Sequence, residues 1–471
     1  MRHYTQFYID GRWVDPVDPR SAEVINPATE GVSGIISLGS AADVDKAVAA
    51  ARRAFESWSQ TPVAQRLELL LAIQAEYARR SSELGDAVTE EMGAPTALGQ
   101  GFHVGLGAGH LQTAIEVLRE YRFEEQRGPT LIVKEPIGVC GLITPWNWPL
   151  NQVTVKIFPA LATGCTMVLK PPQLAPYSAQ ILAGIIHAAG TPAGVFNMVQ
   201  GAGSTIGAAL SQHPDVDMIS FTGSEQVGAQ ITKDAADTVK RVGLELGGKS
   251  AWVILDDADM AANVGAATAG MMVNAGQTCS AGSRLLVPAS RLDEAIATAT
   301  SAAAGVTVGD PNGDVAMGPV VSKAQYNVVQ DYIRIGLEEG ATLIAGGPGR
   351  PDGLHKGFYC KPTVFVTTNE TRIAREEVFG PVLVLIAYDD LDHAVAIAND
   401  SPFGLGGYVS GQDADVARKV ARRLRTGAVW INGGFDFHAP FGGYKRSGNG
   451  REWGAAGFEE YLETKALVGY A

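Results

Sequence analysis

Apolar residues recur along this chain with two different periods. From Ser40, which can cap a helix together with Asp43, apolar side chains follow at helical spacing to Trp58, so the pattern predicts an amphipathic helix. Further on, short β-prone runs alternate with alanine-rich segments of helical periodicity. The runs are TMVLK, GVFNMV, DMISFTG, AWVIL, RLLVP, TVFV, VLVLIAY and AVWIN. This alternation predicts an α/β fold with parallel sheets covered by helices.

One segment breaks the alternation. Residues 120–136, EYRFEEQRGPTLIVKEP, place charged and β-prone residues on both sides of the turn-like sequence Arg127-Gly128-Pro129. We expect a hairpin that projects from the body of the protein. Its natural partner is the C-terminal segment YLETKALVGY.

Length and charge narrow the class of protein. A chain of 471 residues is long enough for two or three domains. Its net charge of -13 and the lack of a basic patch disfavour nucleic acid and anionic membranes as partners. With no signal-like or membrane-spanning apolar run, we expect a cytoplasmic protein.

The cysteines point away from a metal site. In the cytoplasm the four thiols should stay reduced, and none of them has the close spacing of a zinc or redox motif. Cys140, Cys165 and Cys360 lie in apolar surroundings typical of buried cysteines. Cys279, in GQTCSAGSR, has small and hydroxylated neighbours instead.

Two glycine-rich segments are similar to phosphate-binding loops. Residues 243–250, GLELGGKS, match GxxxxGK[ST] letter for letter, but that loop works only between a strand and a helix, and AWVILDDAD predicts a second strand. A nucleoside triphosphatase is therefore disfavoured. Residues 201–207, GAGSTIG, follow a predicted strand and open a helix-like run, yet their spacing differs by one residue from the dinucleotide fingerprint.

Glu245 and Cys279 form a candidate catalytic pair. Their separation of 34 residues (279 − 245) suits one strand-helix unit, which would bring both to the same end of a sheet. A thiol nucleophile and a carboxylate base are chemically coherent. The non-catalytic alternatives are a cysteine packed in the core and a glutamate in a surface turn. A cysteine protease is disfavoured because none of the eight histidines lies in a companion motif.

The segment Thr144-Pro-Trp-Asn-Trp-Pro149 follows the apolar strand GVCGLI. Two prolines restrict the backbone, and each indole N–H needs a partner, so the segment is a poor core filler. We interpret it as a functional loop in which Asn147 offers an amide donor.

Five motifs occur in one order: PWNWPLN, LELGGKS, GQTCSAGSR, EEVFGPV and PFGGYKRSG. Through them the chain resembles the aldehyde dehydrogenase superfamily from about Phe7 to its C-terminus. The resemblance implies an NAD(P)-dependent, non-phosphorylating, hydrolytic oxidoreductase (EC 1.2.1.-) that uses no metal. A catalytically inactive relative is the remaining alternative, and the intact Asn147, Glu245 and Cys279 disfavour it.

The resemblance assigns the chemistry. Cys279 would add to the aldehyde carbonyl as a thiolate and form a thiohemiacetal, whose oxyanion the Asn147 amide and the Cys279 backbone N–H would stabilise. Hydride transfer to nicotinamide would leave a thioester. Glu245 would activate the water that hydrolyses it to a carboxylic acid. Relatives that transfer the acyl group to coenzyme A typically lack this glutamate.

The resemblance also implies a dinucleotide site, for NAD or NADP. Its residues would be Trp146, Lys170, Gln173, Gly223, Ser224, Glu377 and Phe379. The family's common KPSE is KPPQ here, so a neutral Gln173 replaces the carboxylate that usually binds the adenosine ribose. A carboxylate repels a 2′-phosphate and an amide does not, so we expect NADP to be accepted at least comparably to NAD. The alternative is that Gln173 simply binds the ribose of NAD.

The resemblance places a substrate tunnel in front of Cys279. Its walls would comprise Trp148, Asn151, Val155, Phe435, Phe437 and Phe441. Asn151 and Val155 are polar or small where many relatives carry bulkier apolar groups. The tunnel is therefore expected to be roomy and to suit a long-chain, aryl or semialdehyde substrate.

The implied architecture has three parts. A Rossmann-type cofactor domain would comprise residues 1–118 and 137–246, and an α/β catalytic domain residues 247–446. A small β arm, residues 119–136 and 447–471, would pair strands across subunits of a homodimer or homotetramer and cover their edges.

Overall fold

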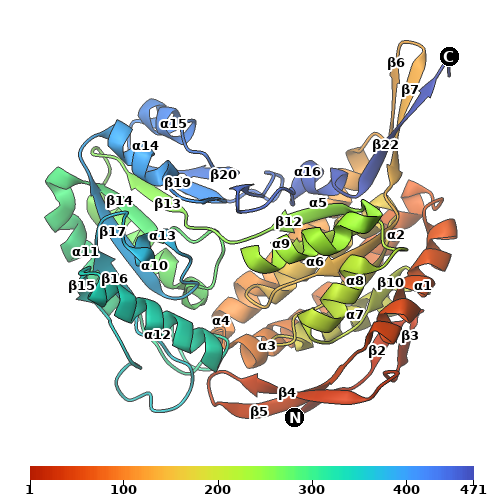
Figure 1. Cartoon of the computed structure of the whole chain (residues 1–471), viewed down its shortest axis with the longest axis horizontal. Coiled ribbons are helices and arrows are strands. Elements are labelled where there is room, and N and C mark those ends of the chain that lie inside the picture. The colour runs from red at the N-terminus through yellow and green to blue at the C-terminus, as the bar shows by residue number, and fades with distance from the viewer. Residues whose placement is uncertain (471) are drawn as a thin grey trace.

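The computed structural model describes residues 1–470, in which two seven-stranded sheets lie side by side (Figure 1). The strands predicted from apolar runs are all present, and within each sheet most neighbours are parallel. This confirms the predicted α/β class. The chain passes from the first sheet to the second between Glu245 and Ala251.

The first sheet is ordered β12-β11-β8-β9-β10-β2-β3. Its strands are β2 (Phe7–Ile9), β3 (Arg12–Val14), β8 (Val139–Ile143), β9 (Thr166–Lys170), β10 (Phe196–Met198), β11 (Met218–Thr222) and β12 (Arg241–Glu245). Alternate residues of β9 enter different cores: Met167 and Leu169 face one, Val168 the other. Burial on both faces explains why its apolar run is continuous.

Helices cover both faces of this sheet. The first core contains residues of α2 (Val63–Arg79), α3 (Ser81–Met92), α5 (Val104–Glu120), α6 (Pro149–Thr163) and α7 (Tyr177–Ala188). The second contains residues of α1 (Ala41–Trp58), α8 (Ala208–Gln212) and α9 (Glu225–Ala235). The predicted cap of α1 is confirmed, because the Asp43 carboxylate accepts the Ser40 backbone N–H at 2.9 Å.

The second sheet is ordered β15-β16-β17-β14-β13-β19-β20. Its strands are β13 (Ala251–Ile254), β14 (Arg284–Pro288), β15 (Thr342–Ala345), β16 (Thr363–Val366), β17 (Val382–Tyr388), β19 (Gly406–Ser410) and β20 (Ala428–Ile431). The accompanying helices are α10 (Met260–Met272), α11 (Leu292–Ala304), α12 (Lys323–Glu338), α13 (Arg372–Arg375), α14 (Leu391–Asn399) and α15 (Ala414–Ala421).

Short elements complete the fold. They are β1 (Arg2–Tyr4), β4 (Arg20–Asn26), β5 (Gly31–Leu38), α4 (Thr96–Leu98), β18 (Phe403–Gly404), β21 (Tyr444–Lys445) and α16 (Gly454–Glu459). None of the helices among residues 1–470 is long and apolar enough to cross a membrane.

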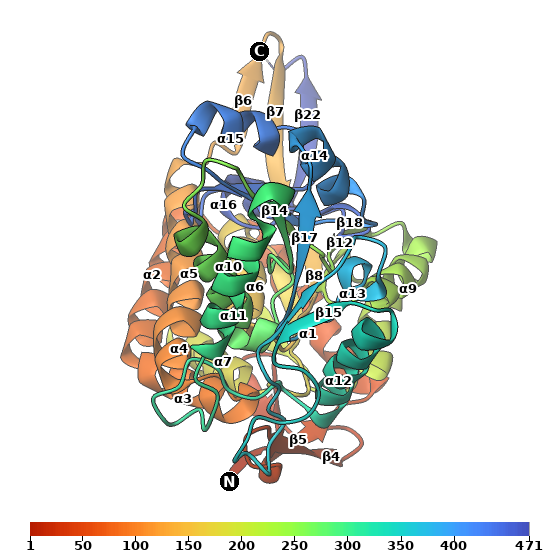
Figure 2. The ribbon, with the colours of Figure 1, turned by 90° about the vertical axis from the view of Figure 1, so that its left-hand side faces the viewer.

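The predicted hairpin projects from the body, as Figures 1 and 2 show. It consists of β6 (Glu124–Arg127) and β7 (Thr130–Pro136), joined at the predicted turn. The C-terminal strand β22 (Leu462–Val468) pairs antiparallel with β7 along its whole length. The pairing predicted between hairpin and C-terminal segment is thus confirmed within one chain.

Candidate active site

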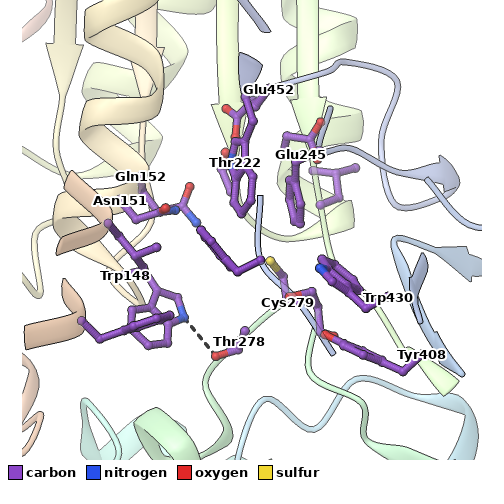
Figure 3. A pocket seen from close by; sticks show the side chains of 18 of the residues that line it. Trp148, Asn151, Gln152, Thr222, Glu245, Thr278, Cys279, Tyr408, Trp430 and Glu452 are labelled. Carbon is purple, nitrogen blue, oxygen red and sulfur yellow. Dashed lines mark hydrogen bonds between the residues drawn. The ribbon is translucent and has the colours of Figure 1, made fainter. Parts of the chain in front are cut away.

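A cavity of about 260 Å³ lies between the two sheets and contains both candidate catalytic residues. Glu245 reaches it from the carboxyl end of β12, and Cys279 from the loop that precedes β14. In Figure 3 the Cys279 sulfur lies at the centre, with Glu245 and Trp430 on one side and Trp148 and Asn151 on the other. Glu245 is therefore not a surface glutamate, and Cys279 lines a cavity and is not simply packed in a core.

An unusual backbone presents Cys279. After α10, Asn274 and Ala275 both adopt left-handed conformations, with φ of 53° and 54°, which non-glycine residues rarely adopt without support. Asn274 provides that support, because its side-chain amide donates to the Asn147 carbonyl at 2.7 Å. Gln277 donates to the Asn274 carbonyl at 2.9 Å. The loop is therefore fixed before any substrate arrives.

The electrostatics at Cys279 favour the protonated thiol. Burial, and then the negative charges of Glu377 and Glu245, raise the pKa of the Cys279 thiol well above its ordinary value. A reaction that uses the thiolate therefore has to remove this proton against its surroundings.

Glu245 is a buried carboxyl group without hydrogen-bond partners among the described residues. Only 4% of the residue is exposed, and neither carboxylate oxygen has a hydrogen-bond partner among the described residues. Burial, followed by the charge of Glu452, raises the pKa of the Glu245 carboxyl well above its ordinary value. A carboxylate with a raised pKa is a stronger base and suits proton abstraction near neutral pH.

The sequence did not reveal a buried ion pair behind Glu245. Lys156 of α6 donates to Glu452 and, at 3.0 Å, to the Ser220 hydroxyl. The two ions are opposed in their effect on Glu245, since Glu452 raises its pKa and Lys156 lowers it. Glu452 lies shortly after PFGGYKRSG and lines the cavity. Its position beside that motif was the one sequence feature that could have indicated a place in the site.

Asn147 lies behind the Cys279 loop and does not line the cavity. It is 2% exposed, and its side-chain N–H donates to the Gln277 carbonyl at 3.1 Å. Its amide oxygen has no partner among residues 1–470. The structure thus brings Asn147 to the loop that carries Cys279, where its partner Gln277 lies two residues before the cysteine.

Most of the predicted tunnel residues line the cavity. Trp148, Asn151, Phe435 and Phe441 do so, and the Trp148 indole N–H donates to the Thr278 hydroxyl at 2.9 Å. This hydrogen bond ties the start of α6 to the residue before the nucleophile.

Two predicted tunnel residues are absent from the cavity wall as the structure describes it. Val155 lines a separate cavity of about 20 Å³ together with His110 and Trp453. Phe437 packs edge-on against His110, with ring centroids 5.2 Å apart, and sits against Gly109, where a Cβ atom would approach its ring to 2.0 Å. The structure therefore places Val155 and Phe437 outside the wall of the 260 Å³ cavity, with His110 and Trp453 as their neighbours.

An aromatic wall was missed in the sequence. Trp252, Tyr408 and Trp430 stand in register on β13, β19 and β20, so their rings stack with centroids 4.8 Å apart in both contacts. All three line the cavity. The Tyr408 hydroxyl donates to the Ser280 carbonyl at 2.9 Å and so holds the residue after Cys279.

Glu377 and its neighbours lie close to the end of β12, where Glu245 is found. The Glu377 carboxylate accepts the Gly248 backbone N–H at 3.0 Å, and burial raises the pKa of Glu377 to about 7. A Cβ at Gly247 would lie 2.4 Å from this carboxylate, so any larger residue there would displace Glu377. Phe379 packs edge-on against Trp146 at 5.4 Å, which brings together two more residues predicted for the cofactor.

The other predicted cofactor residues lie at the carboxyl ends of the first sheet. Lys170 ends β9 and is buried, which lowers the pKa of its amine to about 8. Gln173 is partly exposed in the following loop. Gly223 donates to the Glu245 carbonyl at 3.0 Å, and Ser224 caps α9. Ligands of open parallel sheets bind at this edge.

The phosphate-loop pattern has the wrong context in the structure. Residues 246–250 are followed directly by β13 and not by a helix. No helix N-terminus can therefore cradle phosphates there, and the triphosphatase interpretation is excluded. Residues 201–207 do lead into helical turns, the short Gly203–Gly207 π-helix and α8.

Known proteins share this sequence and architecture. Residues 13–467 match the model of the aldehyde dehydrogenase family. A 3-succinoylsemialdehyde-pyridine dehydrogenase from a Pseudomonas species is 56% identical over 474 residues, which cover 100% of this chain and 99% of the relative.

Solved structures agree with the sequence comparison. A cysteine-to-alanine mutant of aldehyde dehydrogenase C from Pseudomonas syringae, complexed with NAD+ and octanal, has a TM-score of 0.98 at 52% identity and covers 99% of this chain and 97% of its own. Betaine aldehyde dehydrogenase from Staphylococcus aureus in complex with NAD+ has a TM-score of 0.95 at 38% identity, with 99% and 95% covered. These values confirm the fold class that the motifs implied.

Proposed function

Since the chain belongs to the aldehyde dehydrogenase family, whose members carry out NAD-dependent aldehyde oxidation (EC 1.2.1.-), we propose that it converts its aldehyde to a free carboxylic acid through a thioester on Cys279. The observation that carries this proposal is the presence of a thiol and a partner-free buried carboxylate in one cavity. The thiol serves as nucleophile and the carboxylate as base.

The first step is addition of the Cys279 sulfur to the aldehyde carbon, which forms a C–S bond and an oxyanion. The Asn147 amide donates to the carbonyl of Gln277, two residues before Cys279, and its second N–H would be the donor to this oxygen. Together with the Cys279 backbone N–H it would stabilise the charge. Loss of one such donor typically costs about 2.7–4 kcal/mol.

The second step needs a base. When bound, the nicotinamide accepts the hydride, and the acyl group then remains on Cys279 as a thioester. Glu245, with its raised pKa, takes a proton from water, and the resulting hydroxide attacks the thioester carbon. The thiolate leaves and the carboxylic acid is released. This buried base favours hydrolysis over transfer to coenzyme A.

The residues at the sheet edge fit a dinucleotide. Glu377 offers a carboxylate for ribose hydroxyls, and Gly247 beside it leaves that carboxylate its present position. Lys170 is buried without an ion pair among the described residues, so its amine is available for a ribose hydroxyl. NAD+ accompanies two of the related structures, and we infer that it binds here as well.

The cavity walls favour a long apolar or aromatic aldehyde. Rings from both sheets line it, among them Trp148, Trp252, Trp430 and Phe441. The relatives act on or hold aldehydes of both kinds, as their names indicate: a pyridine semialdehyde in one and octanal in the other. We infer that aryl semialdehydes and medium- to long-chain aldehydes are the substrates.

We also infer a homodimer or homotetramer built through the projecting arm. β22 ends one side of the three-stranded sheet β22-β7-β6, and its Val468 is 82% exposed. An exposed edge strand of this kind can pair with another strand or subunit.

The proposed function is tested by following reduced nicotinamide in the near ultraviolet with octanal and with an aryl semialdehyde. We expect turnover with NAD and accumulation of the free acid, with or without added coenzyme A. Absence of turnover with every aldehyde would favour an inactive relative. An acyl-coenzyme A product would contradict hydrolysis.

Gln173→Glu is expected to shift the cofactor preference towards NAD. The new carboxylate would repel the 2′-phosphate of NADP, so kcat/KM with NADP should fall about tenfold or more relative to NAD. The measurement is the ratio of the two kcat/KM values in wild type and variant, with Gln65→Glu, exposed on α2 and outside the cavity wall, as a charge-matched control. An unchanged ratio would mean that Gln173 does not face the adenosine ribose.

A further inference from the structure

Two polar side chains meet beside the otherwise aromatic end of the cavity. His110 of α5 lies with its Nε2 atom 2.7 Å from Oδ1 of Asn151 on α6. His110 is 4% exposed, and Asn151 lines the cavity. The pair therefore extends from the interior of the protein to the substrate space.

His110 fixes the direction of the Asn151 amide. Burial lowers the pKa of His110 to about 4, so its imidazole is neutral at pH 7 and carries one N–H. The rings of Phe437 and Trp453 pack edge-on against it at 5.2 and 5.3 Å and hold it in place. With Oδ1 accepting from Nε2, the Asn151 Nδ2 group is directed elsewhere.

Nδ2 has no protein acceptor within residues 1–470, whereas Oδ1 is bonded. The neighbours of Asn151 on the wall are largely aromatic or aliphatic, among them Phe102, Leu106 and Trp148. Removing an amide N–H from water without giving it a partner is unfavourable. A substrate that supplies an acceptor at this point relieves the cost, and a purely aliphatic chain does not.

The distance along α6 places this donor relative to the reacting carbon. Trp148, at the start of the helix, is hydrogen-bonded to Thr278 beside the nucleophile, and Asn151 follows three residues later. Three residues correspond to about 4.5 Å along a helix axis. Asn151 and Cys279 line the same cavity, so a substrate bound to the sulfur also passes this donor.

We propose that Asn151, oriented by His110, is a specificity-determining residue that donates a hydrogen bond to a ketone oxygen of the substrate, so that keto aldehydes bearing an aromatic ring, γ-keto aldehydes among them, are preferred. This proposal rests on the proposed function, since it concerns the same cavity. The aromatic wall receives the ring, and Asn151 recognises the ketone.

The test compares γ-oxo-γ-phenylbutanal with γ-phenylbutanal, which differ only in replacement of the ketone by a methylene group. In wild type we expect kcat/KM to favour the ketone about 10- to 100-fold, the range for loss of a partner by a buried donor. Asn151→Leu should reduce this preference to near unity or reverse it. Because both rates come from one preparation, their ratio does not depend on the fraction that folds.

A second variant tests the role of His110. His110→Phe keeps the ring contacts but frees the amide to rotate, so the preference should fall several-fold, mainly through KM for the ketone. A structural role alone would lower both substrates equally. A wild-type ratio near unity, or a preference that survives Asn151→Leu, would overturn the proposal. Octanal turnover in the same preparations separates this outcome from failure of the proposed function.

Discussion

Cys279→Ala is expected to abolish aldehyde-dependent formation of reduced nicotinamide. Without the sulfur no thiohemiacetal forms, and removal of a covalent nucleophile commonly costs about 10⁴-fold or more in kcat. The methyl group of alanine fits wherever the thiol fitted, so the cavity should stay intact. The measurement is the initial rate with octanal and NAD at saturating concentrations.

The matched control is Cys360→Ala. Cys360 is 1% exposed in the core of the second sheet and lies outside the cavity wall. Its removal should reduce stability slightly and leave the rate within about twofold, since losing one small buried group acts on folding and not on the site. Activity that survived in Cys279→Ala, with the purity of the sample established by mass spectrometry, would disprove covalent catalysis at this residue.

The same variant allows a binding experiment. Aldehyde and dinucleotide contacts made by the walls are unchanged in Cys279→Ala, so cofactor binding measured by calorimetry should persist while turnover is lost. Loss of both would indicate a damaged fold. Measuring binding and turnover separately matters because the loop around Cys279 contains the left-handed residues Asn274 and Ala275. A substitution that disturbed this strained backbone would damage the whole site and not only the nucleophile.

Much of the fold was foreseeable because burial on both faces leaves a simple signature. β9 and β17 are fully apolar runs for this reason. β19 escaped prediction because it begins with two glycines, and a Cβ at Gly407 would meet Leu424 at 2.9 Å. Tertiary packing thus requires glycine where strand propensity disfavours it. The β1-β5-β4 sheet was missed for a similar reason, since Gly34 packs against the Arg2 carbonyl.

The residues of the candidate site also differ in how far the sequence predicted them. Cys279 and Glu245 lie in local motifs, so the resemblance located them, and the structure brings them into one cavity. Lys156 and Glu452 become meaningful only as a pair separated by 296 positions, which no local pattern reveals. Val155 lies one turn from Asn151 but lines a different, smaller cavity, which helical spacing alone does not reveal. Residues that lie in local chemical motifs could be predicted from the sequence. Residues whose place depends on tertiary packing could not.

Glu245→Gln is expected to stop the reaction after one turnover. The amide has nearly the same shape as the carboxylate but cannot accept a proton from water, so hydrolysis of the thioester should slow about 10²- to 10⁴-fold. Rapid mixing should show a burst close to one equivalent of reduced nicotinamide per active site. Mass spectrometry of the stalled enzyme should find the acyl group on Cys279.

The rate of the burst decides whether Glu245 also acts in the first step. Its negative charge raises the pKa of Cys279, so replacing it by a neutral amide should favour the thiolate and leave the burst at least as fast as in wild type. A slow or missing burst would mean instead that Glu245 removes the thiol proton.

The pH dependence provides an independent criterion for the same residue. In wild type the hydrolysis step requires ionised Glu245, and burial together with Glu452 raises the pKa of that carboxyl above its ordinary value of 4.5. The rate of hydrolysis should therefore be maximal above this raised pKa and should fall as the pH falls through it. In Glu245→Gln this acidic limb should disappear while the residual rate stays low. An acidic limb that persisted unchanged would assign it to another group and remove Glu245 from the role of base.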